Sequence, residues 1–172
     1  MKIDFYIVNS EYIDFLKQYE IEHRGFTCVP NIVYANRDKF VYGAVLEIDR
    51  KKYYVPVSSK TRGKEDDILI KDKKNTVKGS LRFAYMIPVP NECISNLVID
   101  NISDENRKIL ISKELWFCRR NKDRIEKQAI KTYKRIVGKV NSGLVRNSCD
   151  FKLLEEAYIA YCQIHNEVSK LF

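Results

Sequence analysis

Apolar and polar residues alternate in short runs along the first half of the chain, and polar turns separate these runs. Residues 3–7 alternate between apolar and polar side chains, which is the two-residue period of a β-strand. Residues 41–48 form a nearly continuous apolar run, which is typical of a buried strand. We therefore expect mostly short antiparallel strands in this half, forming a sheet that closes partly into a barrel.

A hairpin is predicted over residues 41–57, because the polar turn 49–52 separates two apolar runs. Pro56 has no N–H group to donate, so we expect the return strand to lie at an edge of the sheet or to end there. A polar loop over residues 58–67 and a strand over residues 68–70 should follow. One more strand, stopped by Pro88, is predicted by the alternation of Leu81, Phe83, Tyr85 and Ile87.

Apolar residues recur at helical spacing in the remaining segments. Ser10 should cap a first helix, and residues 20–38 lose periodicity and are expected to form a loop that contains one extended piece. Ser103 should cap a second helix, a third should run over about residues 121–140, and Asp150 should open the last. Strands followed by helices predict the α+β class, as a single domain of residues 1–172.

The chain is basic, with 31 Lys and Arg against 23 Asp and Glu and a net charge of +8. Such a balance favours a polyanionic partner, which is RNA, DNA or an anionic membrane surface. Five dispersed cysteines without a C-x-x-C pair argue against zinc and suit a reducing compartment. With no apolar leader or spanning segment, we expect a cytoplasmic protein without a membrane partner, metal or other cofactor.

The strongest charge lies in residues 119–139, which hold nine basic and two acidic residues. At 3.6 residues per turn, apolar side chains share one face of this helix and basic side chains the other. Like charges four residues apart destabilise a helix unless something such as a phosphate backbone neutralises them. We therefore favour RNA binding over a merely solvated face. The predicted RNA-binding face consists of Arg120, Arg124, Lys127, Lys131, Lys134 and Arg135.

A second basic cluster, with no acidic residue in it, is expected to surround the hydroxyl pair Ser58-Ser59. Hydroxyl donors and lysines held at a phosphate can orient an RNA 2′-OH and stabilise the charge that develops on phosphoryl oxygens. An ordinary turn capped by its own hydroxyls explains Ser-Ser-Lys alone equally well. The cluster consists of Arg50, Lys51, Lys52, Lys60, Arg62 and Lys64.

Three functions remain open on the residues alone: an RNA-cleaving enzyme, a non-catalytic protein that binds RNA or assembles ribonucleoprotein, and a DNA-binding regulator. His23 and His165 have no partner visible in the sequence, and no metalloprotease, serine-hydrolase or glycine-rich phosphate motif occurs. No helix-turn-helix with a small-residue turn is apparent, which disfavours the regulator. The hydroxyl pair favours the enzyme, because a pure binding protein needs only the positive charge.

Several segments together carry a pattern that can be recognised, and the most specific is the final block 149–156, together with the Met-Ile-Pro end of the run 83–88. The other segments are residues 3–7, 12–16, 34–39, 45–48, 53–60 and 114–117. Through these segments, nearly the whole chain resembles the ToxN/AbiQ family of type III toxins, especially its CptN branch.

The resemblance implies a compact, twisted antiparallel sheet or partly open barrel surrounded by helices, similar to Kid/MazF-type toxins. It implies a bacterial endoribonuclease that cleaves RNA without a metal, leaving 2′,3′-cyclic phosphate and 5′-OH ends. Its partners would be cellular RNA and a repeated pseudoknot RNA antitoxin, bound in a closed protein–RNA hetero-oligomer. By position, the active-site pattern of the family falls on Tyr34, Lys39, Ser58 and Ser59. The proline that often follows the hydroxyl pair is missing, so Lys60 is assigned to the phosphate, with Lys64 as the alternative.

Overall fold

The computed structural model describes residues 3–31, 33–34 and 37–170, with the backbone alone for residues 33, 34, 37 and 38. The strands are β1 (Asp4–Val8), β2 (Val33–Tyr34), β3 (Arg37–Asp38), β4 (Val41–Ile48), β5 (Lys51–Ser58), β6 (Ile68–Lys71), β7 (Val77–Leu81), β8 (Ile87–Pro88) and β9 (Ile94–Asn96).

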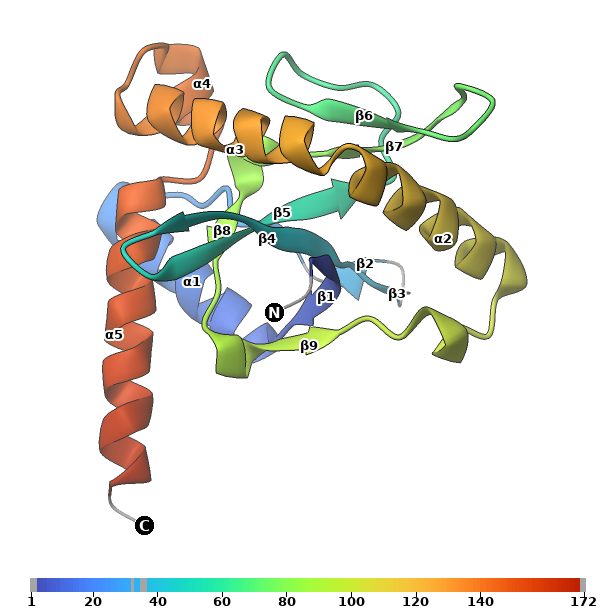
Figure 1. Cartoon of the computed structure of the whole chain (residues 1–172). Coiled ribbons are helices and arrows are strands. Elements are labelled where there is room, and N and C mark those ends of the chain that lie inside the picture. The colour runs from blue at the N-terminus through green and yellow to red at the C-terminus, as the bar shows by residue number, and fades with distance from the viewer. Residues whose placement is uncertain (1–2, 32, 35–36, 171–172) are drawn as a thin grey trace.

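One antiparallel sheet organises the fold (Figure 1). Among the described residues, seven strands pair in the order β6-β7-β5-β4-β1-β9, with β8 also on β5, and β2 pairs only with β3. Within this described part, the edge strands β6 and β9 do not pair with each other, so the sheet stays open. The predicted α+β class, with a partly open antiparallel sheet and helices around it, is confirmed.

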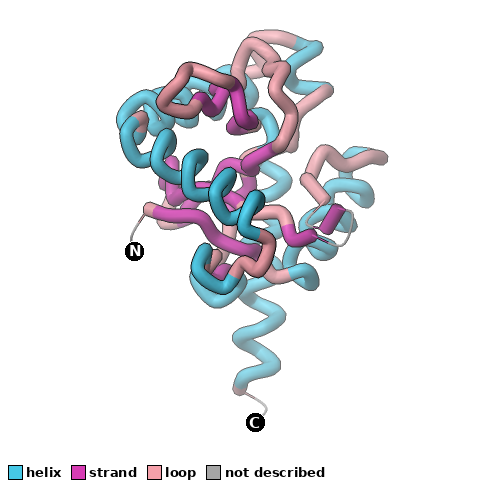
Figure 2. Tube along the Cα trace, turned by 90° about the vertical axis from the view of Figure 1, so that its right-hand side faces the viewer, coloured by secondary structure: helices cyan, strands magenta, loops and turns pink. Residues whose placement is uncertain are grey.

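Helices cover the sheet and one of them projects from it (Figures 1 and 2). The α2–α3 pair crosses over the sheet, α2 packing on β6 and β7 and α3 on β4, while α1 packs on α5. The C-terminal half of α5 extends beyond the rest of the molecule in both views. The helices are α1 (Ser10–Arg24), α2 (Glu105–Arg120), α3 (Lys122–Val137), α4 (Ser142–Arg146) and α5 (Phe151–Ser169), with 3-10 turns η1 (Phe83–Tyr85), η2 (Asn91–Cys93) and η3 (Ile99–Asn101).

Three of the four long helices, α1, α2 and α5, begin at a side chain that accepts backbone hydrogen bonds, and α3 begins without one. Asn9 accepts from two N–H groups of α1, Asp104 from Arg107 of α2, and Asp150 from Leu153 of α5. The predicted cap at Asp150 is confirmed. The predicted cap Ser10 was wrong by one residue, because Asn9 before it carries the accepting oxygen. The predicted cap Ser103 was wrong by one residue in the other direction, because Asp104 after it accepts the hydrogen bond.

The hairpin of β4 and β5 turns in two residues rather than the predicted four. Asp49 and Arg50 have φ values of 47° and 65°, the left-handed conformation that a tight two-residue hairpin requires. Ile48 therefore pairs directly with Lys51, and Lys52 also belongs to the strand. Lys51 and Lys52 were assigned to the turn because their side chains are polar, but both belong to β5.

Pro56 lies inside a central strand, so the expectation that it marks an edge was wrong. β5 pairs with β4 on one side, and on the other side it changes partner around Pro56. Tyr54 pairs with β8 before this point and Val57 with β7 after it. A strand tolerates proline where no ladder hydrogen bond is needed from its nitrogen. Here the Pro56 carbonyl still accepts from Arg82 N at 3.1 Å.

The prediction of one continuous strand over residues 81–87 was also wrong. The chain leaves β7, turns through η1 and enters β8, because both strands must reach the same side of β5. Phe83 and Ile87 are still fully buried, so the apolar spacing reported burial correctly but not backbone conformation. Short apolar runs do not separate these cases by periodicity alone.

Buried polar groups fix the last helix to the sheet. Glu155 of α5 accepts hydrogen bonds from the hydroxyls of Tyr53, at 2.8 Å, and Tyr133, at 2.6 Å. Lys152 completes the cluster with an ion pair of 3.0 Å to the other oxygen of Glu155. Because buried polar groups without partners are costly, these bonds set the position of α5 and α3 on β5.

Candidate active site

The predicted hydroxyl pair lies at the end of the central strand β5. Ser58 is the last residue of the strand, and Ser59 and Lys60 are exposed in the loop that follows. Ser58 Oγ accepts a hydrogen bond of 3.2 Å from Lys60 N, and Ser80 Oγ donates one of 2.8 Å to Lys60 O. The backbone of Lys60 is thus held from both sides, while its side chain stays exposed.

Strand β7 and helix α2 support this loop from behind. A Cβ atom at Gly79 would lie 2.5 Å from the Ser58 carbonyl oxygen and 2.8 Å from Glu114 Oε1, so only glycine allows this approach. Glu114 is 3% exposed, and burial raises its pKa to about 8. Its carboxyl group is therefore mostly protonated at pH 7. Glu114 was noticed only as part of the similar segment 114–117, and its burial behind β7 was not predicted, because its helix lies far along the chain from the loop.

Lys39 reaches the same end of β5. Val57 N donates a hydrogen bond of 3.2 Å to Phe40 O, so residues 39–40 run beside the last residues of the strand. Lys39 is exposed and lines a small hollow together with Val57. The structure therefore brings Lys39 close to Ser58. Tyr34 belongs to β2 and pairs with Arg37, but its side chain lies outside what the structure describes.

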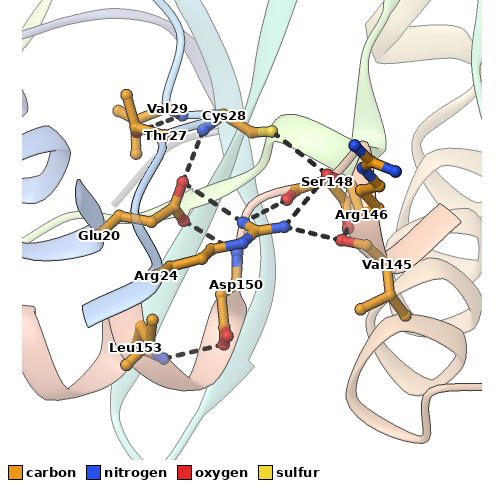
Figure 3. Close-up of polar contacts among 10 residues, drawn as sticks. All are labelled: Glu20, Arg24, Thr27, Cys28, Val29, Val145, Arg146, Ser148, Asp150 and Leu153. Atoms are coloured by element: carbon orange, nitrogen blue, oxygen red, sulfur yellow. Dashed lines mark hydrogen bonds and ion pairs between the residues drawn. The ribbon is translucent and has the colours of Figure 1, made fainter. Parts of the chain in front are cut away.

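The segment that leads towards Lys39 is fixed by a buried carboxylate (Figure 3). Glu20 is fully buried and accepts from Cys28 N at 2.6 Å and from Asp150 N at 2.9 Å. Arg24 lies 3.5 Å from Glu20 and donates to the carbonyl of Ser148 at 2.8 Å. Residues 20–24 were expected in a loop, but they are helical, because this buried polar contact replaces the missing apolar periodicity.

Side-chain contacts with Tyr85 and Arg82 hold the far part of the loop after β5. Lys64 Nζ donates to Tyr85 Oη at 3.1 Å, and the Arg82 guanidinium carbon lies 5.6 Å from the centre of the same ring. Asp67 pairs with Arg82 at 3.2 Å and accepts from Lys64 N. Burial raises the pKa of Asp67, although both partners act in the opposite direction. Since the Lys64 ammonium is engaged by Tyr85, Lys60 is the freer cation.

Three of the basic residues predicted around the hydroxyl pair lie elsewhere. Arg50, Lys51 and Lys52 stand at the opposite end of β5 from Ser58, roughly 20 Å away for an extended strand. Lys51 is moreover only 8% exposed. The prediction that they surround the loop was wrong, because a straight strand separates residues that are near in sequence. Lys60, Arg62 and Lys64 do belong to the loop after β5, where Arg62 is exposed.

The predicted two-sided character of the basic helix is confirmed. Apolar residues such as Ile125 and Ala129 are fully buried, and the lysines of α3 are exposed. Arg120 is the last residue of α2 rather than part of α3. Arg135 is half-buried and pairs with Asp66 at 2.6 Å, so this guanidinium ties α3 to the loop. The exposed members of the face are Arg120, Arg124, Lys127, Lys131 and Lys134.

The hydroxyl pair, Lys60 and the backbone segment that carries Lys39 thus lie at the same end of β5, where Ser59, Lys60 and Lys39 are exposed. Such hydroxyl and ammonium groups can bind phosphoryl oxygens and stabilise the charge that they gain during transfer.

In the described part of the chain, no helix has the length and apolar character needed to span a bilayer.

Comparison with known proteins gives one consistent result. The family described as toxin ToxN of type III toxin–antitoxin systems matches residues 4–159. An endoribonuclease ToxN of Pectobacterium atrosepticum is 31% identical, covering 90% of this chain and 91% of its own. The endoribonuclease AbiQ of Lactococcus lactis is 26% identical, covering 94% and 90%.

Solved structures agree with this match. A structure of AbiQ, described as a lactococcal anti-phage endoribonuclease, superposes with a TM-score of 0.82 at 22% identity, covering 95% of this chain and 99% of its own. A toxin described as selectively inhibited by a non-coding RNA pseudoknot gives 0.81 at 24% identity, covering 94% and 98%. A third structure, described by regulation of an antiviral system by a processed non-coding RNA, gives 0.76 at 28% identity, covering 90% and 96%.

Proposed function

The chain belongs to the ToxN family of type III toxin–antitoxin systems, and from this premise we propose that it is an endoribonuclease toxin. The observation that carries the proposal is that the segment of Lys39 runs beside the end of β5, where Ser58, Ser59 and Lys60 lie. The names of the relatives, endoribonuclease ToxN and endoribonuclease AbiQ, support the same activity. The whole chain would act as one catalytic unit in the cytoplasm.

The proposed reaction needs no metal. The 2′-hydroxyl of a ribose gives up its proton as its oxygen attacks the adjacent phosphorus, the bond from phosphorus to the 5′-oxygen breaks, and the 5′-oxygen takes up one proton. The products are a 2′,3′-cyclic phosphate and a 5′-OH. Lys39 and Lys60 would stabilise the phosphoryl oxygens, and Ser58 and Ser59 would orient the phosphate through hydrogen bonds. We assign Tyr34 to proton transfer, for which a phenol is chemically competent.

The proposed inhibitor is a repeated RNA that folds into a pseudoknot. A toxin of this fold is described as inhibited by a non-coding RNA pseudoknot, which supports the proposal for this chain. The exposed face of α3 offers a separate basic surface for such a folded RNA, while its cut ends would reach the loop after β5. A closed assembly of alternating protein and RNA would follow from these two contacts.

The decisive experiment incubates the purified protein with cellular RNA in the presence of EDTA and maps the new ends. Cleavage with 2′,3′-cyclic phosphate and 5′-OH ends is expected. Loss of cleavage in EDTA with recovery on adding magnesium, or products with 3′-OH and 5′-phosphate ends, would overturn the mechanism. RNA binding without any cleavage would instead support a non-catalytic RNA-binding protein.

A further inference from the structure

Two basic hollows meet at Trp116, outside the residues assigned to cleavage. The first, of about 640 Å³, lies between residues 63–75 and the junction of α2 and α3. The second, of about 780 Å³, lies between the β6–β7 turn and the outer face of α2. Trp116 is half-buried and lines both. In Figure 1 this region lies where the β6–β7 hairpin passes over the α2–α3 junction.

The hollows are strongly positive. Nine of their lining side chains are basic and three are acidic. Asp67 pairs with Arg82, which lies outside the lining, while Asp72 pairs with Lys78 and Lys108 pairs with Asp100. The nine basic and three acidic lining residues leave a formal charge of +6 (nine minus three), which suits a polyanion.

Binding of phosphate alone does not need the indole ring of Trp116, which lines both hollows. Lys73 Nζ lies 5.5 Å and Arg120 Cζ 5.2 Å from its centre. Neither cation pairs with a carboxylate among the described residues. An aromatic face flanked by unpaired cations matches the two parts of a nucleotide, because a base stacks on the ring and phosphates bind the cations.

We propose that Trp116 is a stacking platform for one base of a single-stranded RNA, with its neighbouring phosphates in the two basic hollows. The position supports a strand that continues from the cleavage site, because Lys64 and Asp67 of the loop after β5 also line the first hollow. A base on Trp116 would then fix the register of the strand over Ser59. The inference rests on the proposed function for its choice of RNA.

The test uses the intrinsic fluorescence of the protein, since Trp116 is the single tryptophan of the chain. A 2′-O-methyl hexa-adenylate is titrated into the wild-type protein, because it cannot be cleaved. A hexamer with the same phosphates but without bases serves as the matched probe. We expect the adenylate to quench the tryptophan emission and the abasic hexamer to leave it nearly unchanged. Equal responses to both probes would overturn the proposal.

Two variants give an independent readout with a fluorescently labelled adenylate. Trp116→Leu removes the stacking face and should weaken binding roughly five- to hundredfold, whereas Trp116→Tyr should stay close to wild type. Thermal unfolding of both variants checks that they fold, and the wild-type quenching result stands even if Trp116→Leu does not. Wild-type affinity in a folded Trp116→Leu would contradict the platform.

Failure of this inference is distinguishable from failure of the proposed function. The probe is bound and not cut, so stacking on Trp116 in a protein that cleaves no RNA would refute only the enzymatic proposal. Normal cleavage of cellular RNA, combined with no base-dependent quenching, would refute only the stacking platform.

Discussion

Ser80 Oγ donates a hydrogen bond of 2.8 Å to the carbonyl oxygen of Lys60. Ser80 is fully buried in β7 and lies opposite Ser58 in the strand pairing. The bond therefore connects the inside of the sheet to an exposed loop that carries the proposed phosphate-binding lysine. Ser80 would touch no substrate itself, and we regard it as a positioning residue.

Ser80→Ala should lower kcat for RNA cleavage about tenfold or more while leaving RNA affinity nearly unchanged, because a misplaced Lys60 stabilises the transition state less well. Single-turnover cleavage and binding of a 2′-O-methyl probe measure the two effects. Ser95→Ala, at an exposed position of β9, is the matched control. A Ser80→Ala protein with wild-type kcat would show that the bond serves stability alone.

Ser59→Ala and Lys39→Ala should each abolish toxicity and reduce cleavage about a hundredfold or more, as loss of a transition-state donor does. Both side chains are exposed, so thermal unfolding should change little. Thr61→Ala removes another exposed hydroxyl of the same loop and should behave as wild type, and Lys39→Arg tests the need for an ammonium group. Growth arrest by both alanine variants at wild-type expression would refute the assigned site.

Glu114 makes stability depend on pH. Its pKa of about 8 in the folded protein lies above the value of about 4.3 for an unfolded chain. Between these values the folded state holds a proton that the unfolded state has released, so this group lowers the free energy of unfolding as the pH rises, by at most roughly 1.4 kcal/mol per pH unit. Glu114→Gln should therefore lose less stability than wild type between pH 5 and pH 8.

Urea unfolding at four pH values across this range measures the effect. Glu167→Gln, in the exposed part of α5, is the control and should follow the wild-type curve. Parallel curves for wild type and Glu114→Gln would mean that Glu114 is ionised in the folded protein.

Lys127, Lys131 and Lys134 should contribute to inhibition by the RNA antitoxin. Replacing all three by glutamine should weaken binding of the repeat RNA and reduce its salt dependence by up to about two to three units of slope, because fewer counterions are released. Cleavage of short substrates should change little. Replacement of all three by arginine keeps the charge and should preserve the slope. An unaltered slope in the glutamine variant would leave this face as solvated surface only.

Local patterns predicted much of the fold, and the errors have a common physical origin. The strand over residues 41–48 and the helix opened by Asp150 could be predicted because their signals lie within a few residues. The central place of Pro56 and the turn η1 depend on which strands share β5, and this is decided by contacts between distant segments. Periodicity reports which side chains are buried, and it does not report what they are buried against.

In the candidate site, too, some residues could be predicted from the sequence and others could not. Resemblance to a family singled out Lys39 and the hydroxyl pair, and the structure brings Lys39 to the end of β5 where Ser58 lies. The roles of Ser80 and Glu114 could not be predicted, because Ser80 holds the loop from another strand and Glu114 lies against Gly79 from a helix that is distant in sequence. The misplacement of Arg50 shows the opposite error, in which nearness in sequence was taken for nearness in space.

The buried side chain of Glu20 also links completion of the fold to the order in which the chain is synthesised. It binds one backbone N–H group early in the chain, at Cys28, and one late, at Asp150. A chain still attached to the ribosome therefore lacks the second donor until the start of α5 has emerged, and Glu155 reaches Tyr53 later still. If the protein cuts RNA as proposed, we expect its nascent form to spare the messenger that encodes it until the start of α5 has left the ribosome.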